Sequence, residues 1–205
     1  MDVGIAYLPK HYFSNKPDAG GHFPFAIEGT ASYVFDIHDF YLPECDENFV
    51  LLWMKNIKAY PIYFCSEILS SWKEEYEKDC EEANVYYKYL FQSPQLTVAV
   101  TEIQNEKQFQ EIFPWFITMG TSNEIVVWSA NKDVFSVEQR EWTGNWDGKI
   151  TETIVVKVEP DASIFWIGYD GTSIAVLSNN PQFSTYENIC GTLPDFINPT
   201  QWELE

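Results

Sequence analysis

Hydrophobic residues recur at helical spacing in one stretch of the chain and at strand spacing in most of the rest. Between Ser66 and Pro94 the apolar positions lie three and four residues apart, which puts them on one face of an α-helix. We therefore predict a long amphipathic helix whose buried face is Leu69, Trp72, Tyr76, Cys80, Ala83 and Tyr87. Its exposed face would carry the acids Glu74, Glu75, Glu81 and Glu82.

Most other apolar segments are short and typical of strands. The segments expected as strands are 22–29, 32–40, 49–56, 58–64, 95–103, 124–129, 133–137, 151–158, 162–169 and 172–178. We expect 124–129 and 133–137 to form a hairpin. The last three segments would form a meander with a tight turn at Asp170-Gly171, because both central positions of a type I′ turn need a positive φ.

The remaining segments complete the prediction of the fold. Residues 1–21 read as irregular, and short helices are expected over 105–113, ending at Pro114, and over 184–195. Helices and strands do not alternate in βαβ order. The pattern therefore favours α+β with a mainly antiparallel β-sheet, one long amphipathic helix and one or two short helices. We expect a single domain over 1–205, with 104–123 as its one plausible boundary.

The charge of the chain restricts its partners. Its 31 acidic and 12 basic residues give a net charge of −19, and Arg140 is its only arginine. Binding to nucleic acid requires basic patches that neutralise phosphates, so direct binding is not expected, and neither is binding to an anionic membrane. A basic protein partner is the natural complement, because opposite potentials speed encounter. The alternative, that the acidity only maintains solubility, stays open.

No catalytic or cofactor motif stands out in the sequence. The start of the chain lacks a basic segment followed by a sustained apolar one, so a cytoplasmic protein is expected. The cysteines have no zinc-like spacing and are expected to be reduced; they are Cys45, Cys65, Cys80 and Cys190. Asp36, His38 and Asp39, with His22 from a neighbouring strand, could hold a metal, but we favour a surface histidine beside acids. We therefore expect no metal, no cofactor and no enzymatic activity.

The segment 137–152 is the best candidate for an interaction site. It joins two strand regions, contains two glycines and is expected to be a loop that carries two tryptophans among four acids. Large aromatics on exposed loops tend to anchor interfaces. The candidate partner-binding residues are Glu138, Glu141, Trp142, Trp146, Asp147 and Glu152. The alternative is that both tryptophans pack into the core. The acids of the predicted long helix form a second candidate surface.

The function class that follows is an acidic binding protein that inhibits a basic protein partner. Its most concrete form is a bacterial immunity or antitoxin-type inhibitor, whose carboxylates occupy the phosphate-binding groove of a nuclease-like toxin. One alternative is a DNA mimic that blocks a DNA-binding or defence enzyme, which requires acids spaced like phosphates. Another is a carbohydrate-binding or hydrolytic domain, because paired carboxylates and stacking aromatics serve both. A deep pocket with converging polar groups would favour the last of these.

Overall fold

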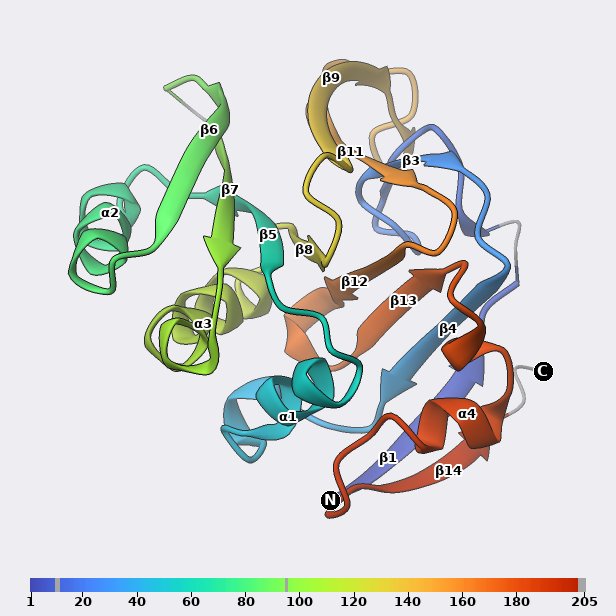
Figure 1. The fold of residues 1–205 in the computed structure, drawn as a ribbon. Coiled ribbons are helices and arrows are strands. Elements are labelled where there is room, and N and C mark those ends of the chain that lie inside the picture. The colour runs from blue at the N-terminus through green and yellow to red at the C-terminus, as the bar shows by residue number, and fades with distance from the viewer. Residues whose placement is uncertain (10–11, 95, 203–205) are drawn as a thin grey trace.

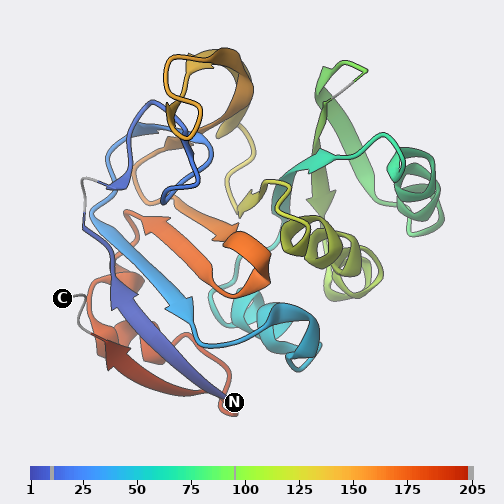
Figure 2. The same cartoon turned by 180° about the vertical axis from the view of Figure 1, so that it is seen from behind.

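The computed structural model describes residues 1–9, 12–94 and 96–202 and is α+β with mostly antiparallel sheets, as the pattern predicts (Figure 1). Its main feature is a nine-stranded sheet. In spatial order its strands are β14 (Asn198–Trp202), β1 (Asp2–Tyr7), β4 (Tyr33–His38), β13 (Ile174–Ser178), β12 (Ser163–Ile167), β8 (Val126–Ser129), β5 (Ile62–Ile68), β7 (Thr97–Ile103) and β6 (Tyr86–Gln92). Neighbouring strands are antiparallel, except that β1 and β14 run parallel at one edge (Figure 2).

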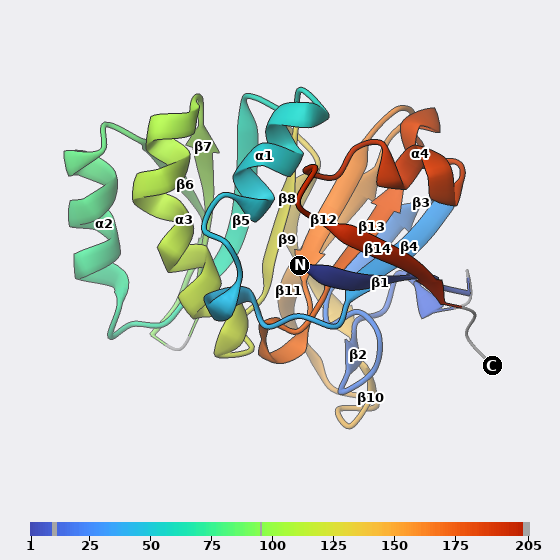
Figure 3. The same cartoon turned by 90° about the horizontal axis from the view of Figure 1, so that it is seen from below.

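Helices cover one face of this sheet (Figure 3). They are α1 (Phe49–Asn56), α2 (Lys73–Glu82), α3 (Glu106–Thr121) and α4 (Tyr186–Cys190), with short 3₁₀ segments η2 (Leu42–Glu44), η3 (Tyr169–Gly171) and η4 (Pro181–Phe183). The core between helices and sheet is rich in stacked aromatic rings. Phe64 of β5 stacks on Phe116 of α3 with ring centroids 4.1 Å apart, and Trp128 of β8 stacks on Phe165 of β12.

Smaller sheets cover part of the opposite face (Figure 3). One is three-stranded, in the order β3 (Ala26–Gly29), β11 (Ile150–Val158) and β9 (Phe135–Glu141), and the other pairs β2 (Asp18–Ala19) with β10 (Thr143–Gly144). A second apolar core lies here. Alternate residues of β12 therefore enter different cores: Phe165 packs under the helices, whereas Ile164 and Trp166 pack under the smaller sheet. A central strand that is buried on both faces has a nearly continuous run of apolar residues in its sequence.

The long helix predicted between Ser66 and Pro94 is wrong in extent. The segment starts as the end of β5, forms helix only over α2, and becomes the edge strand β6. The helix ends because Asn84 adopts a left-handed φ of 52°. The N–H of Val85 donates to the carbonyl of Cys80, and that of Asn84 to the carbonyl of Glu81, which is a Schellman motif. Tyr76 and Cys80 are buried, whereas Leu69, Trp72, Ala83 and Tyr87 are only half-buried.

Three further predictions of local structure are wrong. The apolar run 49–56 is the helix α1 and not a strand, because a short apolar run has the same composition in either element. The helix predicted to end at Pro114 is α3, which contains this proline and continues to Thr121. Residues 2–7, expected to be irregular, form β1.

The predicted pairing of strands is partly confirmed. Segments 124–129 and 133–137 do not form a hairpin, because β8 pairs with β5 and β12 while β9 pairs with β11. β12 and β13 are antiparallel neighbours, as predicted. β11 pairs with β3 and β9 instead of β12, so the predicted three-stranded meander is wrong. The connection between β12 and β13 includes Asp170 and Gly171 with φ of 57° and 68°, so both residues have the positive φ that the turn prediction requires.

Candidate functional site

The segment 137–152, expected as a loop, is largely a β-hairpin. β9 continues to Glu141, β11 begins at Ile150, and the two strands pair along their length. We call the connecting residues 142–149 the hairpin tip. Its ends are closed by a hydrogen bond from the N–H of Trp142 to the carbonyl of Lys149 (2.7 Å). The tip is therefore a defined structure that fixes where its side chains lie.

Gly144 lets the hairpin tip approach β2. It has a φ of 68°, and a Cβ at this position would lie 2.6 Å from the carbonyl oxygen of Ala19. A side chain here would meet backbone, which cannot move aside easily. Glycine is thus required for β10 to pair with β2.

The two tryptophans of the hairpin tip have different environments. Trp142 is 7% exposed and its Nε1 donates to Thr151 Oγ1 (2.8 Å), whereas Trp146 is 44% exposed. The ring centroids are 4.8 Å apart, so Trp142 supports the more exposed ring. Lys149 Nζ lies 4.7 Å from the centroid of Trp146, which is the geometry of a cation–π contact. Trp146 is therefore the tryptophan that a partner can reach.

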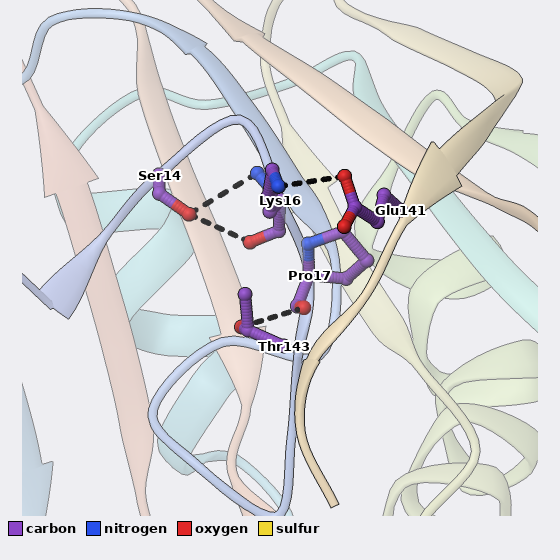
Figure 4. Close-up of polar contacts among 5 residues, drawn as sticks. All are labelled: Ser14, Lys16, Pro17, Glu141 and Thr143. Atoms are coloured by element: carbon purple, nitrogen blue, oxygen red, sulfur yellow. Dashed lines mark hydrogen bonds and ion pairs between the residues drawn. The ribbon is translucent and has the colours of Figure 1, made fainter. Parts of the chain in front are cut away.

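Two of the predicted acids form ion pairs within the chain. Glu141 Oε2 lies 2.7 Å from Lys16 Nζ. Thr143 Oγ1 donates a hydrogen bond to the carbonyl of Pro17 close by (Figure 4). On β9, the guanidinium of Arg140 lies 2.8 Å from Glu138 and 2.6 Å from Glu28. These ion pairs attach the segment before β2 and the strand β3 to the hairpin. Glu138 and Glu141 therefore have less charge available for a partner than the sequence suggests.

A cavity of about 660 Å³ lies between the hairpin tip and the turn that joins β6 to β7. We call it the Trp146 groove. Its aromatic residues are Phe91, Trp142, Trp146 and Tyr169, and its carboxylates are Glu67, Glu124 and Glu152. Among the residues that the structure describes, no lysine, arginine or histidine lines it. The groove thus combines aromatic walls with three acids from different elements.

The Trp146 groove contains half of the predicted binding residues. Trp142, Trp146 and Glu152 line it, whereas Glu138, Glu141 and Asp147 do not. Glu152 accepts a hydrogen bond from Gln139 Nε2 (3.1 Å), and this bond lowers its pKa. The prediction therefore located the aromatic side of the groove and one of its acids.

Glu67, at the end of β5, is the acid of the groove whose ionisation is most perturbed. Its Oε2 accepts a hydrogen bond from the N–H of Ile125 (3.0 Å), and its own N–H donates to the carbonyl of Ile125. Burial raises the pKa of Glu67 to about 7, the Ile125 N–H opposes this shift, and the neighbouring Glu124 adds to it. Burial also raises the pKa of Glu124. The carboxyl of Glu67 therefore keeps its proton to a higher pH than an exposed glutamate does.

Four of the aromatic and acidic residues of the groove are absent from the sequence prediction: Glu67, Phe91, Glu124 and Tyr169. The predicted long helix begins at Ser66 and Glu67, so the prediction does not place Glu67 in the sheet, where the structure has it. A usable signal is nevertheless present, because Glu67 interrupts the apolar run of β5. An acid inside such a run either meets a partner or faces a cavity. Glu124 and Tyr169 become neighbours of Glu67 only through long-range contacts, which no local pattern reports.

Four acids of α2 are exposed, as predicted: Glu74, Glu75, Glu81 and Glu82. Lys78 lies 3.5 Å from Glu82 on the same helix, so part of this charge is balanced locally. α2 and the hairpin tip lie on opposite faces of the nine-stranded sheet (Figure 3). We therefore treat them as two separate candidate surfaces.

Metal and thiol chemistry receive no further support. His22 stacks on Tyr12, while His38 Nδ1 lies 3.1 Å from Asp39, and no cluster of metal-ligating side chains occurs within residues 1–9, 12–94 and 96–202. The four cysteines are free thiols. Burial raises the pKa of Cys65 and Cys80, which disfavours their reactive thiolate forms.

Comparisons with known proteins give no relative. No protein-family model matches the chain, and no similar curated protein or solved structure was found. In the described part of the chain, no helix is long and apolar enough to cross a membrane.

Proposed function

We propose that this protein binds a basic protein partner through the Trp146 groove and inhibits it. The most concrete form is an immunity or antitoxin-type inhibitor of a nuclease-like toxin, acting in a bacterial cytoplasm. One observation carries the proposal: three carboxylates, from β5, from β11 and from the segment before β8, line a groove with aromatic walls and no lysine, arginine or histidine among its described residues. A chain with a net charge of −19 would also attract a basic surface from a distance.

The groove supplies both parts of a tight interface. Trp146 is large, 44% exposed and backed by Trp142, which suits an anchor residue at the centre of a contact. Glu152, on β11, would meet basic side chains that normally hold phosphate. Acids at an interface mainly accelerate association, whereas a desolvated aromatic anchor mainly slows dissociation. The two residue types therefore make separable contributions.

The convergence of acids favours this inhibitor over a DNA mimic. A mimic needs carboxylates in long rows at phosphate spacing, whereas Glu67, Glu124 and Glu152 gather at one cavity. The exposed acids of α2 are the alternative surface for a basic partner. They are tested by the same experiment, because a partner that uses α2 is insensitive to changes in the groove.

The experiment is affinity capture from the native host at low and high salt, followed by purification of the captured protein. Wild-type protein is compared with Trp146→Ala and with Trp202→Ala, which removes another exposed tryptophan (54% exposed) on the distant edge strand β14. We expect a basic protein that is released by high salt, is lost with Trp146→Ala and is retained with Trp202→Ala. Its enzymatic activity should fall when wild-type protein is added. Capture that both variants retain, or a captured enzyme that stays active, would contradict the proposal.

A further inference from the structure

We propose that the Trp146 groove is a receptor for a single arginine side chain, and that Glu67 loses a proton to solvent when the guanidinium enters. This inference rests on the proposed function, because it names the group by which the basic partner would be recognised. It makes a separate claim, since a basic partner could bind without inserting an arginine. The ligand class is fixed by the aromatic walls, by the carboxylates and by the hydrogen-bonding capacity of Glu67.

The aromatic walls favour a planar cation. Trp146 already has the ammonium of Lys149 at 4.7 Å from its ring centroid, so its ring binds a cation within this chain. Trp142, Phe91 and Tyr169 line the same cavity. A guanidinium stacks on such rings and is more weakly hydrated than an ammonium, so a cavity with aromatic walls suits arginine better than lysine.

The carboxylates match the donors of a guanidinium. Its five N–H donors need several acceptors around one plane. Glu67 uses Oε2 for the N–H of Ile125, and within the described residues no hydrogen bond to its Oε1 is found. Glu124 and Glu152 also line the groove. An arginine beside Glu67 would therefore find acceptors from β5 and from the segment before β8, with Glu152 of β11 on the wall of the same groove.

The charges around Glu67 explain why its proton would leave. Glu124 precedes β8 and disfavours the ionised form of Glu67, while the Ile125 N–H favours it. Glu152 on β11 and the half-buried phenol of Tyr169 also line the groove. The positive charge of Lys88 on β6 opposes the rise in the pKa of Cys65. Lys88 does not line the groove. A bound guanidinium would bring a positive charge close to Glu67. This charge stabilises the ionised form of Glu67, so the carboxyl proton passes to the buffer.

The test uses Nα-acetyl-arginine amide, with the citrulline analogue as a neutral control of the same shape and the lysine analogue as a second cation. Isothermal calorimetry near pH 7, in buffers of different ionisation enthalpy, gives the affinity and the protons released. We expect arginine to bind about tenfold more tightly than citrulline, and more tightly than lysine. From a pKa of about 7, roughly half a proton should be released per arginine bound at that pH.

Variants assign the effect to the groove. Glu67→Gln should abolish proton release and weaken the binding of arginine, Trp146→Ala should weaken that binding, and Trp202→Ala should change neither. Equal affinity for arginine and citrulline, or unchanged proton release in Glu67→Gln, would overturn the inference. Because the comparison of probes uses wild-type protein, it decides the matter even where a variant folds poorly.

The inference and the proposed function can fail separately. If a basic partner is captured through Trp146 but the arginine probe does not bind, the arginine receptor is wrong and the inhibitor proposal stands. If the probe binds with proton release but no basic partner is captured or inhibited, the receptor stands and the inhibitor proposal is wrong.

Discussion

Glu67 should make the stability of this protein depend on pH in a direction that its environment determines. Its carboxyl is withdrawn into the Trp146 groove, and its pKa is raised from 4.5 to about 7. Between about pH 4.5 and about pH 7, Glu67 in the folded protein therefore retains a proton that the unfolded chain has already lost. Stability from this group is fully present below about pH 4.5 and is lost as pH rises through about 7.

The size of the effect follows from the shift. One pKa unit corresponds to about 1.4 kcal/mol, so Glu67 should cost the wild-type protein at most about 2–3 kcal/mol of unfolding free energy between pH 5 and pH 8. Glu67→Gln keeps the shape of the side chain and has no ionised form. Relative to wild type, this variant should gain stability at pH 8 by up to that amount and show little change at pH 5.

Urea unfolding at the two pH values measures the effect. Because the whole chain is strongly acidic, the comparison needs a second variant that removes one charge from an exposed position. Glu81→Gln on α2 serves as this control, and it measures the general benefit of lower net charge. If the difference in unfolding free energy between Glu67→Gln and wild type is the same at pH 5 and pH 8, the reasoning about Glu67 is refuted.

Burial and backbone geometry determine how variants at other positions should behave. Trp53→Ala should lower the unfolding free energy by about 3–5 kcal/mol, whereas Trp72→Ala should lower it by less because Trp72 is only half-buried. Chemical denaturation compares the two variants, and equal losses of unfolding free energy would contradict this difference in burial. Gly144→Ala should lower the thermal midpoint, because the added methyl group would meet the carbonyl of Ala19; an unchanged midpoint would show that β2 and β10 need not pair. In thiol titration, the half-buried Cys45 and Cys190 should react in the folded protein and all four cysteines after denaturation, and fast native labelling of Cys65 or Cys80 would contradict their burial.

Local pattern was enough to predict the class of the fold but not the extent of its helices. Alternating segments such as β4 and β7 are strands as predicted, because period-two apolar spacing has one common structural meaning. Tyr87 of β6 fits a helical spacing by coincidence, and the left-handed Asn84 that separates α2 from β6 gives only a weak signal. α1 resembles a strand in sequence because its apolar run is short and without visible period.

The candidate site shows a similar division. The tryptophans stand out because two large aromatics lie close together among acids and glycines. Glu67 and Glu124 could not be joined to them, since the groove brings β5 and the start of β8 to a hairpin that lies far away in the sequence. Whether an acid is paired is also a tertiary property: Glu141 meets Lys16, which lies 125 residues away. Local sequence therefore identifies candidate side chains but not their convergence.

Binding of a basic partner at the Trp146 groove can be measured as kinetics with the purified partner. Association and dissociation rates are determined at low and high salt for wild type, Trp146→Ala, Glu152→Gln and the control Trp202→Ala. We expect Trp146→Ala to speed dissociation by about thirtyfold, equivalent to about 2 kcal/mol, with Trp202→Ala unchanged. Glu152→Gln should slow association at low salt, and this defect should shrink at high salt, because screening removes steering. If the folded Trp146→Ala and Glu152→Gln variants bind and release the partner at wild-type rates, the groove is not the interface.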